Sequence, residues 1–124
     1  MEYAKIFEIL IAIDLCCNKF EGEIPEVVGN LTRLKHLNLS NNMLTGPILL
    51  ALEYLTNLEA LGLSHNKLIG RLPWQLTHLN LLEVFCVSNN HLIGPVPKGQ
   101  EFDTFESSSF DGNAGLWNGT VKEM

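Results

Sequence analysis

Three cysteines and a histidine could act as a nucleophile and base, or as metal ligands. They are Cys16, Cys17, Cys86 and His36. A catalytic thiol needs a base within hydrogen-bond reach and a third group that orients the base. These residues are expected on a shallow surface of small side chains without a water-excluding pocket, and their intervals lack the paired short spacings of zinc sites. We therefore predict that the chain is not an enzyme and has no metal or cofactor.

The same cysteines are expected to be free thiols. Their number is odd, so at least one has no partner within the chain. In a stack of strands about 4.8 Å apart, Cys86 would lie about 14 Å from the other two, whereas a disulfide needs Cα atoms within roughly 7 Å. The neighbours Cys16 and Cys17 are expected to point to opposite sides of a strand, which would keep them apart as well.

An internal repeat positions these residues. The chain aligns on four asparagines at equal intervals, and each ends a pattern L-x-x-L-x-L-x-x-N. The asparagines are Asn18, Asn42, Asn66 and Asn90. A glycine comes shortly after each asparagine, at Gly22, Gly46, Gly70 and Gly94, and a proline follows in three of the four copies. Copies that keep one phase along the chain predict a repeat architecture.

The pattern in each copy predicts a short strand followed by a turn. The L-x-L pair alternates with period two, as in a strand buried on one side, so Leu37 and Leu39 point inward. His36, Asn38 and Ser40 then point outward. The asparagine can bond backbone groups that the turn leaves unpaired, and stacked copies would align the four asparagines in a ladder. The recurring glycines and prolines argue against the alternative, which is four amphipathic helices.

Several segments resemble plant leucine-rich-repeat proteins. Residues 22–25 and 37–46 are similar to the plant-specific repeat, and residues 99–105 and 109–116 resemble the segment that closes the ectodomain of plant receptor-like proteins. The opening at residues 2–6 resembles the junction after their island insertion. These proteins are cell-surface immune and developmental receptors without a kinase of their own. The resemblance covers nearly the whole chain and implies the last four repeats before the membrane, as a truncated ectodomain.

The resemblance implies an α/β leucine-rich-repeat solenoid with a plant-type repeat of about 24 residues. It would be a right-handed superhelix with short parallel strands on its concave face and a second small sheet beside them. We divide the chain into an N-terminal flank at 1–8, four repeats at 9–98, and a closing segment with tail at 99–124. Terminal repeats of solenoids are atypical, and the expected apolar plugs of the closing segment are Phe102, Phe105, Phe110 and Leu116.

The chain departs from the family at two cysteine positions. The family usually ends in Gly-Leu-Cys-Gly, whereas this chain has Trp117 in place of that cysteine. The disulfide that pins the family's closing segment therefore cannot form. The family often has Leu-Ser-Ser-Asn where this chain has Leu15, Cys16, Cys17 and Asn18.

The outward positions of the strands form the expected binding surface, because the core needs only the leucine positions. The residues predicted to contact a protein or peptide partner are Asp14, His36, Asn38, Ser40, Ser64, His65, Cys86 and Ser88. Three Asn-x-Ser/Thr sequences would accept glycans in a secreted chain, at Asn30, Asn38 and Asn118. A glycan on Asn38 would block the concave face, so Asn30, outside the strands, is the favoured site.

Charge and hydropathy limit the other partners. The net charge is −6 and the eight Lys and Arg residues are scattered, unlike the basic stripe of a nucleic-acid-binding protein. No apolar run approaches the roughly 20 residues that span a bilayer, and the N-terminus matches a secretory signal peptide poorly. At the N-terminal edge, Ile6, Leu10, Ile13 and Leu15 would present an apolar surface and an unpaired strand. Such an edge predicts self-association.

The leading functional prediction is a protein-interaction module. The resemblance implies contact with a co-receptor kinase, in defence or developmental signalling, on the extracellular side of the plasma membrane. The alternatives are a secreted leucine-rich-repeat inhibitor of cell-wall-degrading polygalacturonases and a non-functional gene remnant. The receptor-like tail at residues 99–116 favours the first.

Overall fold

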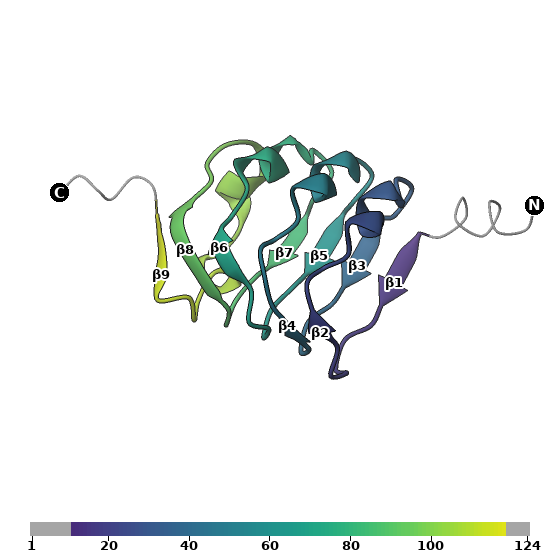
Figure 1. Cartoon of the computed structure of the whole chain (residues 1–124). Helices are drawn as coiled ribbons and strands as arrows, with labels where there is room; N and C mark the ends of the chain where they lie inside the picture. Colours follow the sequence, from purple (N-terminus) through teal and green to yellow (C-terminus); the bar gives the residue numbers. More distant parts are fainter. Residues whose placement is uncertain (1–10, 119–124) are drawn as a thin grey trace, which may run out of the picture.

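The protein is a curved stack of coils, one for each repeat (Figure 1). The computed structural model describes residues 11–118. The predicted flank at residues 1–8 and the tail from residue 119 lie outside the described residues. Of the four apolar residues expected at the N-terminal edge, Ile6 and Leu10 also lie outside them, and Ile13 and Leu15 lie within.

One face of the stack carries a parallel sheet with one strand from each repeat. Its strands are β1 (Ala12–Asp14), β3 (His36–Asn38), β5 (Ala60–Gly62) and β7 (Val84–Cys86), in the order β1-β3-β5-β7. The strands pair with an offset of one full repeat, so Leu37 lies directly between Ile13 and Leu61. The predicted solenoid of short parallel strands is confirmed.

The opposite side is covered by short 3-10 helices. These are η1 (Glu26–Asn30), η2 (Leu50–Tyr54), η3 (Trp74–His78) and η4 (Gln100–Thr104). The first three begin after an extended residue, which is Pro25, Leu49 or Pro73. Proline favours this boundary because it fixes φ and has no N–H to continue a preceding turn. The helical layer consists of 3-10 turns, with no α-helix among residues 11–118.

A second set of parallel strands runs along the flank of the stack. Here β2 (Glu21–Gly22) pairs with β4 (Met43–Leu44), and β8 (His91–Val96) lies between β6 (Ile69–Arg71) and β9 (Gly115–Asn118). A bridge from Pro47 to Ile69 joins the two sheets. The second small sheet implied by the resemblance is present, interrupted near Pro47, which cannot donate to the ladder.

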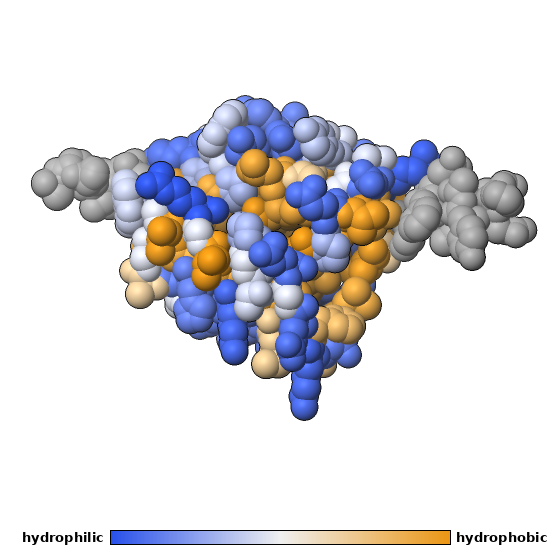
Figure 2. Space-filling model, viewed as in Figure 1, coloured by the Kyte–Doolittle hydropathy of each residue, from blue (hydrophilic) through white to orange (hydrophobic). Residues whose placement is uncertain are grey.

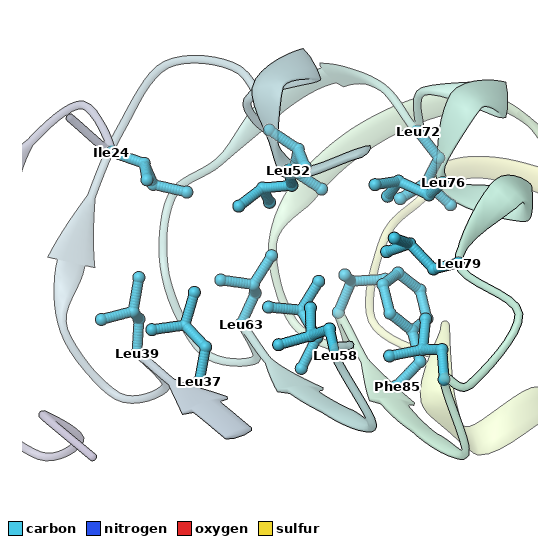
Figure 3. Close-up of a cluster of buried hydrophobic side chains, with 14 of the residues drawn as sticks. Ile24, Leu37, Leu39, Leu52, Leu58, Leu63, Leu72, Leu76, Leu79 and Phe85 are labelled. Atoms are coloured by element: carbon cyan, nitrogen blue, oxygen red, sulfur yellow. The ribbon is translucent and has the colours of Figure 1, made fainter. Parts of the chain in front are cut away.

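The core consists of apolar side chains, mostly leucines, between the concave sheet and the 3-10 helices (Figure 3). Leu37, Leu39 and Leu63 come from the strand side, and Leu52 and Leu76 come from the helical side. All five are buried. Burying one such side chain contributes about 1.5–3 kcal/mol, so each coil is stabilised mainly by packing against its neighbours.

The closing segment is a fifth repeat without a concave strand. Helix η4 packs against η3, β9 extends the flanking sheet, and η5 (Ser107–Ser109) occupies the place of a fifth strand. The backbone N–H of Val87 donates to Ser109 O at 2.9 Å, and that of Asn89 donates to Asp111 O at 2.8 Å. These bonds repeat the pattern that links the earlier coils.

Aromatic rings fill the C-terminal end of the core. The ring centroid of Phe85 in β7 lies 5.0 Å from that of Phe102 and 5.6 Å from that of Phe105. Phe110 follows at 6.0 Å. Phe102 is buried, while Leu116 and the other two closing rings pack partly buried against the core. The four predicted plugs therefore close the last repeat.

Candidate partner-binding surface

Four columns of residues cross the concave face. Because the strands are in register, each column takes one residue from each repeat. The columns are Ala12, His36, Ala60 and Val84; Asp14, Asn38, Gly62 and Cys86; Cys16, Ser40, Ser64 and Ser88; and Cys17, Asn41, His65 and Asn89. Of the eight predicted contact residues, seven are exposed or half-buried on this surface.

Ser88 differs from the sequence expectation. It is only 9% exposed, and the next residue, Asn89, donates its N–H to Asp111 O of the closing segment. The Ser88 hydroxyl lies 3.3 Å from the Sγ of Cys86. Ser88 is therefore too buried to contact a partner directly, and it supports the exposed part of the surface through its contact with Cys86.

Side-chain hydrogen bonds order the middle of the surface. The Oδ1 of Asn38 accepts the backbone N–H of Ser40 at 3.1 Å and the Ser40 hydroxyl at 2.6 Å. On the next strand, a Cβ added at Gly62 would lie 2.9 Å from that Oδ1. Gly62 thus leaves room for the Asn38–Ser40 arrangement. In the first repeat, Asp14 makes the equivalent backbone contact, accepting the Cys16 N–H at 3.2 Å.

The fourth column has left-handed backbone conformations throughout. The φ angle is 66° at Cys17, 58° at Asn41, 57° at His65 and 59° at Asn89. Each residue donates its N–H to a carbonyl of the following coil, as Cys17 does to Ser40 O at 3.0 Å. Asparagine tolerates positive φ better than most residues. The conformation therefore belongs to the repeat, and Cys17 and His65 adopt it as well.

An asparagine ladder holds the turns behind this surface. The Nδ2 of Asn66 donates to the carbonyls of Leu39, Leu63 and Ser64 at 3.0, 3.2 and 3.2 Å. Its Oδ1 accepts the N–H of Leu44 at 3.0 Å. The predicted ladder residues Asn42 and Asn90 make the equivalent bonds one repeat before and after. Each interior rung thus satisfies backbone groups of two coils.

The first rung is incomplete. Asn18 is exposed, and its Nδ2 donates to Leu15 O at 3.0 Å and Cys16 O at 3.1 Å, both in its own coil. Among residues 11–118 there is no earlier coil for it to bond. Within the described residues, Asn18 therefore bonds only to its own turn.

The last rung was missed by sequence reasoning. The Nδ2 of Asn113 donates to Val87 O and Phe110 O at 3.0 Å each. Its Oδ1 accepts the N–H of Leu92 at 3.0 Å. Asn113 comes 23 residues after Asn90, one short of the period, and no L-x-L pair precedes it. An asparagine at nearly the right spacing was the available signal.

All three cysteines are free thiols in this structure. The reason given for Cys16 and Cys17 is nevertheless wrong. Strand β1 ends at Asp14, and the left-handed conformation of Cys17 breaks the alternation of side chains. The two Sγ atoms therefore lie side by side, 3.0 Å apart. Cys86 is three strands away, in β7.

A hollow of about 310 Å³ lies beside β7 at the C-terminal end of the concave face. It is lined by Glu83, Val84, Phe85, Cys86, Thr104, Phe105, Glu106 and Ser109. The hollow exists because η5 stands in place of a fifth strand, which leaves β7 at the edge of the concave sheet. Val84 is 60% exposed there. Sequence reasoning missed the contribution of Glu106, because the closing segment was interpreted only as an apolar plug.

In the part of the chain that the structure describes, no three His, Cys, Asp or Glu side chains are grouped so that they could hold a metal ion. Within residues 11–118, no helix has the length and apolarity needed to cross a membrane.

Comparison with known proteins agrees with the fold and the repeat. A family model described as leucine rich repeat matches residues 10–68. Receptor-like protein 34 of Arabidopsis thaliana is 62% identical over 123 residues, which are 99% of this chain and 13% of that protein. The chain therefore carries leucine-rich repeats and is similar over nearly its whole length to a plant receptor-like protein. It spans only 13% of the length of that relative.

Solved structures of plant leucine-rich-repeat proteins have the same architecture. The BIR3–SERK2 complex from Arabidopsis thaliana has 35% identity and a TM-score of 0.86, covering 95% of this chain and 62% of that one. The ectodomain of the Arabidopsis receptor kinase SOBIR1 has 30% identity and a TM-score of 0.78, covering 88% and 60%. The peptide hormone receptor RGFR1 with RGF2 has 32% identity and a TM-score of 0.71, covering 73% and 14%. The predicted fold class and the family resemblance are confirmed.

Proposed function

We propose that the concave face of this leucine-rich-repeat chain binds a protein or peptide, with the ectodomain of a co-receptor kinase as its partner. The setting is defence or developmental signalling on the extracellular side of the plasma membrane. The observation that carries the proposal is a continuous surface across β1, β3, β5 and β7, most of whose outward side chains are exposed or half-buried. By contrast, the core leucines are buried inside the coil, and the side-chain amides of the ladder asparagines are hydrogen-bonded there.

The chemistry of the surface supports a protein partner. Binding energy concentrates in a few residues that lose water on contact. Val84, which is apolar, and His36, which is amphipathic, are exposed in one column and could serve as such residues. Around them, the hydroxyls and amides of the neighbouring columns provide donors and acceptors. Two of the similar structures also support this function, because one is a complex with SERK2 and another contains the peptide RGF2.

The test is binding of the purified chain to the SERK2 ectodomain by isothermal titration calorimetry. Val84→Arg places a long charged side chain on the concave face, at a position that is 60% exposed. We expect it to weaken binding about tenfold or more, which corresponds to about 1.4 kcal/mol.

Leu50→Arg is the matched control, because Leu50 is 54% exposed on the 3-10 helical side. It is expected to leave the affinity unchanged. Equal losses in the two variants, or no binding by the native chain, would count against a concave site for this partner.

A further inference from the structure

The first coil of the concave face carries two adjacent thiols that contact each other. The Sγ atoms of Cys16 and Cys17 share a hydrogen bond across 3.0 Å. This separation exceeds the length of a disulfide bond by only about 1 Å. Cys17 is exposed and Cys16 is half-buried, so both can be reached by small solutes.

The backbone of the repeat brings the two sulfurs together. Cys17 is held at a φ of 66°, and its N–H is fixed to Ser40 O of the second coil at 3.0 Å. The N–H of Cys16 is fixed to the Asp14 carboxylate at 3.2 Å. Asn41 and Asn89 have nearly the same φ at the equivalent positions. The pairing of the thiols therefore follows from placing two cysteines in a turn that the solenoid already imposes.

We propose that Cys16 and Cys17 form a redox-active dithiol, which a peroxide converts into a disulfide between adjacent residues. In the first step, the Cys17 sulfur attacks one oxygen of hydrogen peroxide and the O–O bond breaks. The leaving hydroxide takes the proton of the Cys17 thiol, so a sulfenic acid and water form. In the second step, the Cys16 sulfur attacks the Cys17 sulfur and displaces its hydroxyl group. That group leaves with the Cys16 proton as a second water, so two thiols are oxidised by two electrons and one peroxide is reduced.

The two sulfurs have different neighbours and therefore different roles in the reaction. The hydrogen bond that protonated Cys16 donates to the Cys17 sulfur, and the nearby Asp14 carboxylate, raise the pKa of the Cys16 thiol to about 12. Cys16 therefore stays protonated at neutral pH, and the exposed Cys17 is the sulfur that attacks the peroxide. Cys16 then acts as the resolving thiol, next to the sulfenic acid that it must reach.

Cys86 provides an internal control. It lies in β7, three strands from β1, which is about 14 Å at the usual strand spacing. Its Sγ contacts the Ser88 hydroxyl at 3.3 Å. A thiol in this position has no second cysteine to resolve a sulfenic acid.

The experiment is oxidation of the reduced 124-residue chain with an equimolar amount of hydrogen peroxide, followed by alkylation, digestion and mass spectrometry. The fragment with Cys16 and Cys17 is expected to lose two hydrogen atoms and to resist alkylation, while Cys86 is alkylated. A fragment that instead gains oxygen, or links two chains, would overturn the proposal.

The repeat itself supplies matched variants. Cys16→Ser introduces the residue found at positions 40, 64 and 88, and Cys17→Asn introduces the residue found at positions 41 and 89. Cys16→Ser is expected to accumulate a sulfenic acid at Cys17 that dimedone traps, and Cys17→Asn to leave Cys16 unoxidised. Cys86→Ser should behave as the native chain. A Cys17 that dimedone does not trap in Cys16→Ser, or a Cys16 that is oxidised in Cys17→Asn, contradicts the assignment.

A trivalent arsenical tests the pairing without an oxidant. One equivalent of phenylarsine oxide is expected to protect two of the three thiols from a thiol-specific disulfide reagent, because it bridges adjacent sulfurs. Protection should be lost in Cys17→Asn and retained in Cys86→Ser. Three thiols that stay equally reactive in the native chain would show that the sulfurs do not act as a pair.

Discussion

The first repeat and the closing segment, which lie at the two ends of the described solenoid, differ in how well they are packed and hydrogen-bonded. The closing segment retains a 3-10 helix, a ladder asparagine and a flanking strand, and it buries the repeat before it. The first repeat has the same pattern but remains open: Leu15 is 43% exposed, whereas Leu63, at the same position two repeats later, is fully buried. Figure 2 shows apolar residues gathered beside the grey N-terminal residues.

The difference shows how much each coil depends on its neighbours. In a solenoid, stability is approximately the sum of each repeat and its two interfaces. Asn42 satisfies the carbonyl of Leu15 in the coil before it, in addition to its own turn. Among residues 11–118, Asn18 bonds only to its own turn. The same residue type at the same position should therefore contribute very differently at the two places, which mutations can measure.

The largest expected effect comes from the inward column. Phe85→Ala removes a buried ring that contacts Phe102 and Phe105, and it should lower the free energy of unfolding by about 3–5 kcal/mol. Ile13→Ala changes the equivalent residue of the first repeat, which is only half-buried, and should cost about 1–2 kcal/mol. Urea denaturation followed by circular dichroism measures both. Equal losses would mean that the first coil is packed as tightly as the fourth.

The ladder should show the next largest contrast. Asn66→Ala removes four hydrogen bonds and leaves the buried N–H of Leu44 without its acceptor. We expect a loss of about 3 kcal/mol, because each unsatisfied buried group costs about 1–3 kcal/mol. Asn18→Ala removes two exposed bonds and should cost less than about 1 kcal/mol.

The stability that Asn113 contributes tests how firmly the closing segment, the fifth coil, is attached. Its bonds resemble those of an interior rung, so Asn113→Ala should cost about as much as Asn66→Ala in the same denaturation experiment. A value close to that of Asn18→Ala would indicate that the closing segment is only loosely attached.

The sequence predicted the repeat because periodicity directly reports inward and outward positions. The L-x-L spacing identified buried positions such as Leu37 and Leu61, and the asparagine spacing identified the turns. These features are local and repeated, so one copy supports the interpretation of the next. The same reasoning missed Asn113, because the closing segment has lost the strand pattern that marks the period.

The details of the concave surface depend on contacts between coils, which no single repeat encodes. The burial of Ser88 accompanies the bond from Asn89 to Asp111, which belongs to the next coil along the chain. The pairing of Cys16 and Cys17 depends on a left-handed turn, whereas period-two alternation predicts that adjacent side chains diverge. The hollow beside Val84 exists because a strand is missing. Each of these features depends on the local backbone or on the neighbouring coil, which the repeat pattern does not report.

The open apolar surface of the first repeat should affect association more than stability. Ile11 and Leu15 are exposed next to β1, which is the edge strand among the described residues. Edge strands with apolar side chains favour contact between molecules. The double variant Ile11→Lys with Leu15→Lys should reduce the apparent mass of the purified chain in light scattering at high concentration. Ile93→Lys is the control, because Ile93 is equally exposed on the flanking sheet. A native chain that is already monomeric would remove the basis for this prediction.

The smallest expected effect concerns the two glycan acceptors in the first and second coils. Asn30 is the exposed last residue of η1, whereas Asn38 is half-buried with its Oδ1 bonded to Ser40. A glycan at Asn30 disturbs no contact that holds a coil, so we expect occupancy there when the chain is secreted from eukaryotic cells.

Asn30→Gln should remove one glycan in mass spectrometry and change the free energy of unfolding by less than about 0.5 kcal/mol. Asn38→Gln should leave the glycan mass unchanged but cost about 1 kcal/mol, because it displaces the acceptor of the Ser40 bonds. Loss of glycan mass in Asn38→Gln instead would place the sugar on the concave face and argue against partner binding there. Asn118, the third predicted acceptor, is the last residue of β9, and its glycosylation stays a prediction.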